Sequence, residues 1–347
     1  CGMHLPIGYG VAPGSAPGHL ALFGYEPLEF PVGRGVVAAL GIGFPLEEDD
    51  VAARLNFATS DLSGRVTDRR AGRIATEDCS ELCALLDGME ISGVKIFVRP
   101  VKDYRAMLVM RGQGLSDCVD DTDPQRVGVL PLSPRAIYPA ANRTAAILTE
   151  FITQARNKLV NRSPANDLLL RGFSIRPSLP PLQEQFAMRG LALAVYPDYI
   201  GISRLVGMDA IDDLKDLDEQ ILALSGSWNG IHRFFFLHHK PTDSAGEDGN
   251  FDAKVAEIER VDAALPAILS LNPDVLIVTG AHSTPAVART HTSHPVPFLI
   301  RSAAVRPDST IEFNEQACAT SAWGILPATA LLPIATSYAG KRRRFGA

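Results

Sequence analysis

The last third of the chain alternates short, continuous apolar runs with a stretch of spaced apolar residues. Residues 234–238 and 275–278 are apolar runs of strand length, Phe-Phe-Phe-Leu-His and Val-Leu-Ile-Val. Between them, from about residue 252, apolar residues recur three or four positions apart: Val255, Ile258, Val261 and Leu265. That spacing predicts a helix, and strand, helix, strand in this order predicts a βαβ unit around a buried parallel sheet.

The earlier part of the chain has a weaker pattern. Residues 8–43 are rich in Gly and Pro and predict loops around a short helix near residues 15–23. From residue 50 to 186, apolar runs at 94–98 and 106–110 predict strands, and the amphipathic stretch 144–160 predicts a helix. The whole pattern indicates an α/β protein, and its 347 residues suggest about two domains.

Composition and charge narrow the class of protein. The net charge of −6 argues against a nucleic-acid partner, and no apolar run approaches the roughly 20 residues that cross a bilayer. Five cysteines without metal-finger spacing suit a reducing cytoplasm, where we expect the protein to be located. The basic run 341–344 predicts a solvated tail, with an anion or RNA contact as the alternative. Because the chain starts Cys-Gly-Met, we expect further residues upstream of Cys1.

Small residues surround a single hydroxyl at the start of the first predicted helix. Ser15 lies in Pro13-Gly14-Ser15-Ala16-Pro17, and a helix N-terminus favours a bound anion such as a phosphate. The alternative is that Ser15 is a plain N-cap residue.

Candidate metal ligands follow the two predicted strands of the last third. Asp243 and Glu247 come after the first strand, four positions apart, and His282 and His291 come after the second, with His294 nearby. Open α/β sheets place ligand sites where strands end, and carboxylate and imidazole groups bind divalent metals. A solvated acidic loop and structural histidines are the alternative. His238 and His239 should point to opposite faces, so at most one faces the site.

Several motifs resemble one known family and occur in its order over nearly the whole chain. They resemble the archaeal-type 2,3-bisphosphoglycerate-independent phosphoglycerate mutases, a branch of the alkaline phosphatase superfamily. The matching segments are Pro13-Gly14-Ser15, residues 22–27 and 33–35, Asn56-Phe57-Ala58-Thr59, residues 68–73, Asp121-Thr122-Asp123-Pro124, Asp243-Ser244-Ala245-Gly246, residues 279–285, His291 and Pro295-Val296-Pro297.

The resemblance implies a fold, a reaction and the residues that perform it. The fold would be an α/β alkaline-phosphatase-like sheet core, residues 1–50 and 190–347, with an inserted smaller α+β cap domain, residues 51–189. The glycolytic reaction would interconvert 3-phosphoglycerate and 2-phosphoglycerate, with Ser15 carrying the phosphoryl group as a phosphoserine and two divalent metal ions, Mn²⁺, Zn²⁺ or Mg²⁺, assisting. Homo-oligomerisation stays open. The implied metal ligands are Asp243, Glu247 and His291 for one ion and Ser15 with His282 for the other, and the implied substrate ligands are Arg34, Asp68, Arg69, Arg70 and Arg73.

Three departures from the family pattern reduce the activity we expect. The family pattern reads Thr-Gly-Asp-His where this chain has Thr279-Gly280-Ala281-His282, so a carboxylate ligand is replaced by a methyl group. A first-strand Asp that the pattern places upstream of residue 1 is absent from the sequence, and Glu247 stands where many relatives have His. We therefore expect an impaired mutase, with a catalytically inactive binding protein and a metal-dependent phosphatase as alternatives.

Overall fold

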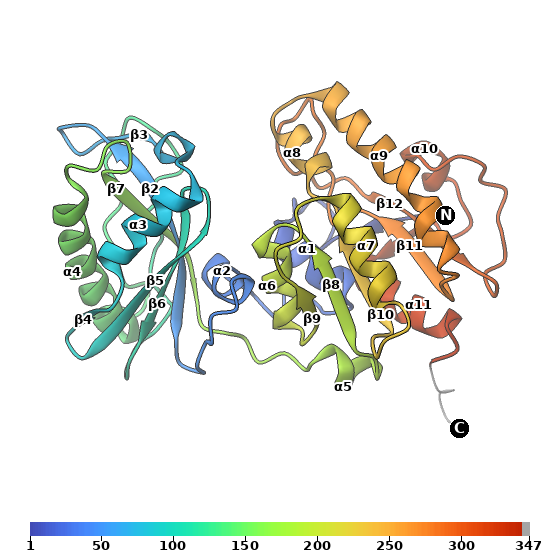
Figure 1. The fold of residues 1–347 in the computed structure, drawn as a ribbon, viewed down its shortest axis with the longest axis horizontal. Coiled ribbons are helices and arrows are strands. Elements are labelled where there is room, and N and C mark those ends of the chain that lie inside the picture. The colour runs from blue at the N-terminus through green and yellow to red at the C-terminus, as the bar shows by residue number, and fades with distance from the viewer. Residues whose placement is uncertain (342–347) are drawn as a thin grey trace. The chain divides into compact units, whose positions relative to one another are not determined.

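The computed structural model describes residues 1–341, and the chain divides into two compact units (Figure 1). Unit 1 comprises Cys1–Pro31, Leu179–Tyr196 and Ile202–Ala347, and unit 2 comprises Val32–Ser178 and Pro197–Gly201. Both combine helices with strands, which agrees with the α/β class. Except for Lys341, the basic run 341–344 lies outside the described residues. No helix of the described part has both the length and the apolar character needed to span a membrane.

Unit 2 is built around one antiparallel sheet. Its strand order is β3-β2-β6-β5-β4, and β7 also pairs with β2. The elements are α2 (Arg34–Gly41), β2 (Val51–Ser60), β3 (Val66–Asp68), the 3₁₀ turn Ala71–Arg73, α3 (Thr76–Leu86), β4 (Met89–Ile91), β5 (Val94–Lys102), β6 (Arg105–Arg111), the 3₁₀ turn Pro139–Ala141, α4 (Asn142–Leu159) and β7 (Asp167–Ser174). The strands predicted at 94–98 and 106–110 and the helix predicted at 144–160 are confirmed, with small shifts at their ends.

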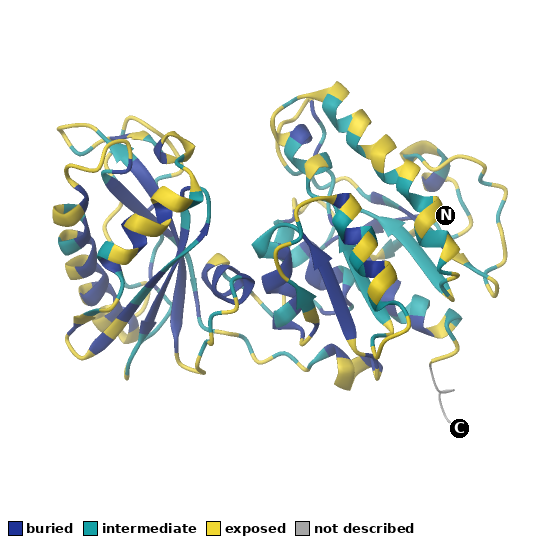
Figure 2. Cartoon of the chain, in the orientation of Figure 1, coloured by how far each residue is buried: buried dark blue, intermediate teal, exposed yellow. Residues whose placement is uncertain are grey.

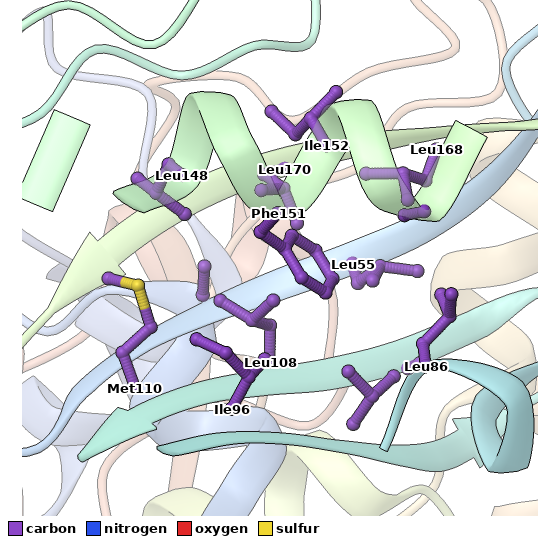
Figure 3. Packing of buried hydrophobic residues seen from close by; sticks show 14 of the residues in the cluster. Leu55, Leu86, Ile96, Leu108, Met110, Leu148, Phe151, Ile152, Leu168 and Leu170 are labelled. Atoms are coloured by element: carbon purple, nitrogen blue, oxygen red, sulfur yellow. The ribbon is translucent and has the colours of Figure 1, made fainter. Parts of the chain in front are cut away.

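Helices α3 and α4 cover one face of this sheet and form the core of unit 2 with it. Alternate residues of β2, such as Leu55, point into this core, where they meet Leu86 of α3 and Phe151 of α4 (Figure 3). Alternation arises because successive side chains of a strand point to opposite faces. The other face of β2 carries Arg54 and Asn56, which are buried polar residues, so the two faces of the same strand have different chemistry.

Helix α2 packs on this second face so closely that only glycine fits at the contact. A Cβ on Gly35 would lie 2.2 Å from the carbonyl carbon of Ala52 in β2. This contact is why residues 32–50, which the sequence analysis assigns to the first domain, lie in unit 2. The other boundary also differs, since unit 2 ends its long segment at Ser178 and takes in residues 197–201, the first part of α6 (Pro197–Leu205).

We expect Gly35→Ala to destabilise the protein by at least about 2 kcal/mol, because the added methyl group meets backbone atoms that cannot move away cheaply. Urea unfolding followed by circular dichroism measures the change. The matched control is Gly226→Ala, where a Cβ meets nothing within 4 Å, and a helical alanine there should be neutral or slightly stabilising. Equal stability of the two variants would contradict the close-packing argument.

Unit 1 contains two separate sheets. One has the order β11-β12-β1-β13 and the other β10-β8-β9. The elements are β1 (Gly2–Leu5), α1 (Ser15–Leu22), α5 (Leu182–Phe186), β8 (Gly190–Ala194), β9 (Asp209–Ile211), α7 (Leu217–Ser227), β10 (Phe234–His238), α8 (Pro241–Glu247), α9 (Phe251–Ser270), β11 (Val275–Thr279), β12 (Val296–Ser302), α10 (Glu315–Ala319), β13 (Ile325–Pro327), the 3₁₀ turn Ala328–Ala330 and α11 (Leu331–Tyr338).

Helix α1 packs against both sheets of unit 1. Its C-cap residue Phe23 makes edge-on ring contacts with Phe234 and Phe236 of β10. One residue earlier, Leu22 packs into the cluster of the four-stranded sheet, which includes Ile277 of β11. Helix α1 therefore links the ends of β10 and β11, where the candidate metal ligands follow.

The predicted βαβ unit is correct in its elements and wrong in its pairing. Strand β10 pairs in parallel with β8, whereas β11 pairs antiparallel with β12, and within residues 1–341 the two do not pair with each other. Both strands are half-buried rather than buried, and no residue of α9 is buried (Figure 2). Continuous apolar runs predict strands but carry no information about which strand becomes the neighbour.

The predicted buried face of α9 is also shifted. Val255 and Ile258 are 36% and 53% exposed. Near the start of α9, Lys254 donates a hydrogen bond to the carbonyl oxygen of Thr242 and Glu257 pairs with His239, so polar contacts orient this end of the helix. At its C-terminal end the helix packs through apolar side chains, since Ile268 joins the cluster around Leu193.

Candidate metal and phosphate site

Three of the predicted metal ligands converge in unit 1. Asp243 lies in the first turn of α8, His282 follows β11, and His291 lies in the loop before β12. Within residues 1–341, these three form the one group of His, Cys, Asp or Glu side chains whose ligand atoms all lie within 4.8 Å of one another. An anionic oxygen and two imidazole nitrogens are a donor set suited to zinc or manganese.

His291 is held so that one ring nitrogen faces the group. Its Nδ1 donates to the carbonyl oxygen of Pro13 at 2.9 Å, so the hydrogen is on Nδ1 when the ring is neutral. Its Nε2 is buried and lies 3.5 Å from Asp243 Oδ1, too far for a good hydrogen bond. A carbonyl that fixes the tautomer of a histidine in this way is typical of metal-ligating imidazoles.

His282 is fixed by a similar chain of contacts. The hydroxyl of Thr284 donates to Asp243 Oδ1 at 2.6 Å and therefore accepts from His282 Nδ1, 3.0 Å away. The hydrogen of a neutral His282 is thus on Nδ1, which leaves a lone pair on Nε2. The rings of His282 and His291 stack with their centroids 3.7 Å apart.

The protonation states of the group suit metal binding. Burial raises the pKa of Asp243, but His291, Lys240 and Thr284 outweigh it and hold that pKa far below its ordinary value. Burial and the neighbouring His291 lower the pKa of His282 to about 3, so this imidazole is neutral at pH 7. Burial lowers the pKa of His291, but Asp243 outweighs it and the net shift is upward, so a cation would compete with a proton there.

Two further charged residues, one at the N-cap of α8 and one at its C-terminal end, lie beside the metal group. Lys240, the N-cap of α8, forms an ion pair with Asp243 Oδ2, the carboxylate oxygen that does not face the histidines. Glu247 is half-exposed, and its Oε1 lies 3.8 Å from His291 Nε2. Glu247 is outside the three-residue group, so its role as a ligand stays a prediction.

The segment that carries Ser15 contacts the surroundings of the metal group through a residue before the serine and a residue after it. Pro13 accepts the hydrogen bond from His291, and Gly18 lies so close to Ala281 that a Cβ on Gly18 would be 2.6 Å from the Ala281 carbonyl oxygen. The N-cap interpretation of Ser15 is wrong, because Gly14 is the N-cap and makes no side-chain cap, so Ser15 is the first helical residue. Capping therefore does not use the Ser15 hydroxyl.

His238 and His239 have different surroundings, as the strand pattern predicts. The His238 ring packs edge-on against His19 of α1, with centroids 5.0 Å apart. His239 Nε2 pairs with Glu257 of α9 at 2.8 Å. Of the two, His238 is thus on the side of the helix that carries Ser15.

The predicted substrate ligands lie in unit 2, and they differ in what they contact there. Arg69 forms a two-pronged ion pair with Asp123, at 2.8 and 2.7 Å. The Asp68 carboxylate accepts from the backbone N–H groups of Arg70 and Gly72, so it shapes the turn.

The residues of this turn at 71–73 all have positive φ, of 47°, 66° and 56°. Its two arginines, Arg70 and Arg73, are exposed. Sparsely populated backbone conformations of this kind cluster at functional sites.

Two arginines that the sequence analysis did not select belong to the same region. Arg171 of β7 is paired in register with Arg54 of β2, and a Cβ on Gly172 would meet Arg34. Burial, Arg34 and Arg54 lower the pKa of Arg171 to about 10, and its buried Nε makes no hydrogen bond in the described part of the chain. Positive charges gathered in this way favour an anion. A single charged residue within an apolar strand, as in Leu168-Leu169-Leu170-Arg171, is the sequence signal that would have indicated it.

Comparisons with known proteins agree on one family. A family model described as 2,3-bisphosphoglycerate-independent phosphoglycerate mutase matches residues 1–166. A protein of Aquifex aeolicus named as a probable member is 42% identical over 357 aligned residues, which cover all of this chain and 87% of that protein. A Thermotoga maritima protein with the same name is 43% identical, covering 100% and 86%.

Two solved structures are similar to this chain, one of which is named a phosphoglycerate mutase. The cofactor-independent phosphoglycerate mutase of Thermoplasma acidophilum has a TM-score of 0.66 and 29% identity, covering 98% of this chain and 88% of that one. A protein of Pyrococcus horikoshii has a TM-score of 0.81 and 27% identity, covering 100% and 88%. The chain therefore belongs to the 2,3-bisphosphoglycerate-independent phosphoglycerate mutase family.

Proposed function

We propose that this protein is an isomerase that interconverts 3-phosphoglycerate and 2-phosphoglycerate through a phosphoserine at Ser15. The observation that carries the proposal is the convergence of Asp243, His282 and His291 beside the segment that holds Ser15. Unit 1 would be the alkaline-phosphatase-like core and unit 2 the inserted cap, and the enzyme would act in glycolysis in the cytoplasm. Phosphoglycerate is the proposed partner, with neither nucleic acid nor membrane involved.

The residues of unit 1 fit a divalent cation, Mn²⁺, Zn²⁺ or Mg²⁺. The evidence for the fit is the buried Nε2 of His291, which lacks a good hydrogen-bond partner and faces an ionised carboxylate. When bound, such a cation neutralises phosphate charge and makes a nearby hydroxyl more acidic. The "cofactor-independent" label of a relative does not bear on metals, since the family's description concerns 2,3-bisphosphoglycerate.

The chain's own groups have distinct roles in this proposal. The Ser15 hydroxyl accepts the phosphoryl group from one substrate oxygen and returns it to the neighbouring one. Lys240, already paired with Asp243, supplies positive charge near the transferring group. Arg34, Arg69, Arg70 and Arg73 bind the carboxylate and phosphate of the substrate through planar guanidinium groups, with Asp68 holding the turn that presents Arg70 and Arg73.

The direct test of function is a coupled assay that consumes 2-phosphoglycerate as it forms from 3-phosphoglycerate. Because Ala281 puts a methyl group in place of a carboxylate, we expect measurable but low turnover that requires added Mn²⁺ or Zn²⁺. Release of inorganic phosphate without 2-phosphoglycerate would contradict the mutase assignment and indicate a phosphatase.

Arg171 provides a test of the substrate-binding arginines that separates binding from folding. We expect Arg171→Met to weaken 3-phosphoglycerate binding at least about 10-fold, because a charge-assisted contact is lost, measured by calorimetry. The free energy of unfolding should stay constant or rise, because the substitution removes a half-buried charge that neighbouring arginines repel. Arg135→Met is the control, since Arg135 is largely exposed and pairs with Asp120. Unchanged affinity in Arg171→Met would remove Arg171 from the site.

A further inference from the structure

Asp121 and Thr122 begin a motif to which the proposed function gives no role. Thr122 exchanges two hydrogen bonds with Leu170 of β7: its N–H donates to the Leu170 carbonyl oxygen, and its hydroxyl oxygen accepts from the Leu170 N–H, both at 2.8 Å. Asp121 Oδ1 accepts from the N–H of Gly172 at 2.7 Å. These contacts fix the backbone on both sides of Arg171.

The third residue of the motif, Asp123, holds Arg69 by one edge of its guanidinium group. The carboxylate accepts from Arg69 Nε at 2.8 Å and from Nη2 at 2.7 Å, and the same Nη2 donates to Gln125 Oε1 at 2.8 Å. Every N–H group of Nε and Nη2 is therefore used. Within residues 1–341, Nη1 forms neither a hydrogen bond nor an ion pair. Arg69 thus keeps one nitrogen for a ligand, in a fixed orientation.

Asp123 itself is out of reach of a ligand. Its side chain is 0% exposed, whereas that of Arg69 is 27% exposed. Asp123 also lies near Arg171, because the charge of each shifts the pKa of the other in the direction that favours both charges. One buried carboxylate therefore stands beside both arginines and contacts only Arg69 by hydrogen bonds from a side chain.

We propose that Asp123 is a positioning residue, which holds the Arg69 guanidinium so that Nη1 of Arg69 and the side chain of Arg171 bind one anionic group of the substrate together. A guanidinium group that is already oriented loses less freedom when it binds a ligand. The inference rests on the proposed function only for the identity of the substrate, phosphoglycerate.

Charge alone predicts the opposite effect of Asp123 on an anion, which makes the test sharp. Asp123→Asn removes a negative charge near the bound anion, so a purely Coulombic role would strengthen binding. The positioning role predicts weaker binding, because the amide NH₂ group cannot accept from Arg69 Nη2.

The probe is inorganic phosphate, titrated into metal-free full-length chain so that no bound cation contributes, and followed by ¹H–¹⁵N nuclear magnetic resonance. We expect Asp123→Asn to weaken phosphate binding at least about 5-fold and Arg69→Met at least about 10-fold. Asp120→Asn is the matched control, because it removes the same charge from the same segment and its partner Arg135 is 82% exposed. It should change phosphate binding less than about 2-fold.

A double variant separates action through Arg69 from an independent effect. Arg69→Met with Asp123→Asn should bind phosphate within about 2-fold of Arg69→Met alone, because two residues that act as one unit are not additive. Urea unfolding shows whether each variant is folded. A second measurement uses the unaltered protein: the Arg69 Nε–H resonance, identified by its loss in Arg69→Lys, should stay protected from exchange when phosphate is bound, since phosphate takes Nη1.

Four results would each overturn the inference: no phosphate binding to the unaltered chain, equal or stronger binding in Asp123→Asn, additive losses in the double variant, or loss of Nε–H protection when phosphate binds. The proposed function fails separately. Phosphate binding that follows the expected pattern in a chain that does not bind 3-phosphoglycerate would support the inference and contradict the proposed function.

Discussion

Replacing Ala281 by Asp, in a protein whose N-terminal segment is restored, is expected to raise mutase turnover at least about 100-fold, which corresponds to lowering the barrier by about 2.7 kcal/mol. Residue 281 precedes His282, and its backbone lies close to Gly18 of the helix that starts with Ser15. A carboxylate there adds negative charge and a hard oxygen donor near that helix. A serine hydroxyl is a poor nucleophile unless its surroundings activate it. Steady-state rates in the coupled assay, at saturating 3-phosphoglycerate and Mn²⁺, measure the gain.

Two further variants show whether this gain acts through Ser15. Ser15→Ala in the Ala281→Asp background should return the rate to the background of the assay, because no phosphoryl acceptor remains. Ala281→Asn has nearly the same shape without the charge and should recover much less activity. Ordinary enzyme rates in the unaltered chain, or full activity in the double variant, would show that the roles assigned to Ser15 and residue 281 are wrong.

The second large effect concerns folding. We expect Asp198→Ala to destabilise unit 2 by about 3–5 kcal/mol, because it leaves a buried guanidinium without its carboxylate. Arg54 is 2% exposed, its Nη2 bonds to Asp198 at 2.5 Å, and its buried Nε makes no hydrogen bond in the described chain. Nearby Arg171 adds repulsion between the two guanidinium groups. Urea unfolding with circular dichroism detects the loss as a lower midpoint.

Asp120→Ala is the control for Asp198→Ala. Its partner Arg135 is 82% exposed, and exposed ion pairs contribute about 0–1 kcal/mol. The double variant Arg54→Met with Asp198→Ala should regain much of the stability, since replacing both partners avoids the uncompensated charge. If Asp198→Ala costs no more than Asp120→Ala, the buried charge of Arg54 is compensated elsewhere.

The spacing of apolar residues predicted most helices and strands correctly. It did not predict which strands pair with each other. The apolar run at 234–238 and the amphipathic stretch at 144–160 became β10 and α4, because burial of periodic apolar side chains is decided locally. Strand partners depend on contacts far along the sequence, and β11 found β12 rather than β10. The boundary of unit 2 near residue 32 also depends on a distant contact that the pattern does not show, the fit of Gly35 against Ala52.

The candidate site was likewise predictable from the sequence only in part. Histidines and carboxylates after strands indicated the group of Asp243, His282 and His291, because open α/β sheets place ligand sites where strands end. Spacing did not show that Thr284 bridges two of them, or that Lys240 takes the second oxygen of Asp243. Arg171 escaped notice because the sequence does not show that Arg34 and Arg54 lie near it, which only the structure reveals.

The outer strands β10 and β11 have a consequence for handling the protein. Each has one neighbour on one side, and within residues 1–341 the backbone groups of the opposite side have no strand partner. Their side chains are mostly Phe, Leu, Val and Ile, half-covered by helices. An apolar edge without a strand partner is a template for intermolecular strand addition. A higher protein concentration is therefore expected to favour edge-to-edge association of the native protein, and dilute samples to favour dispersed molecules.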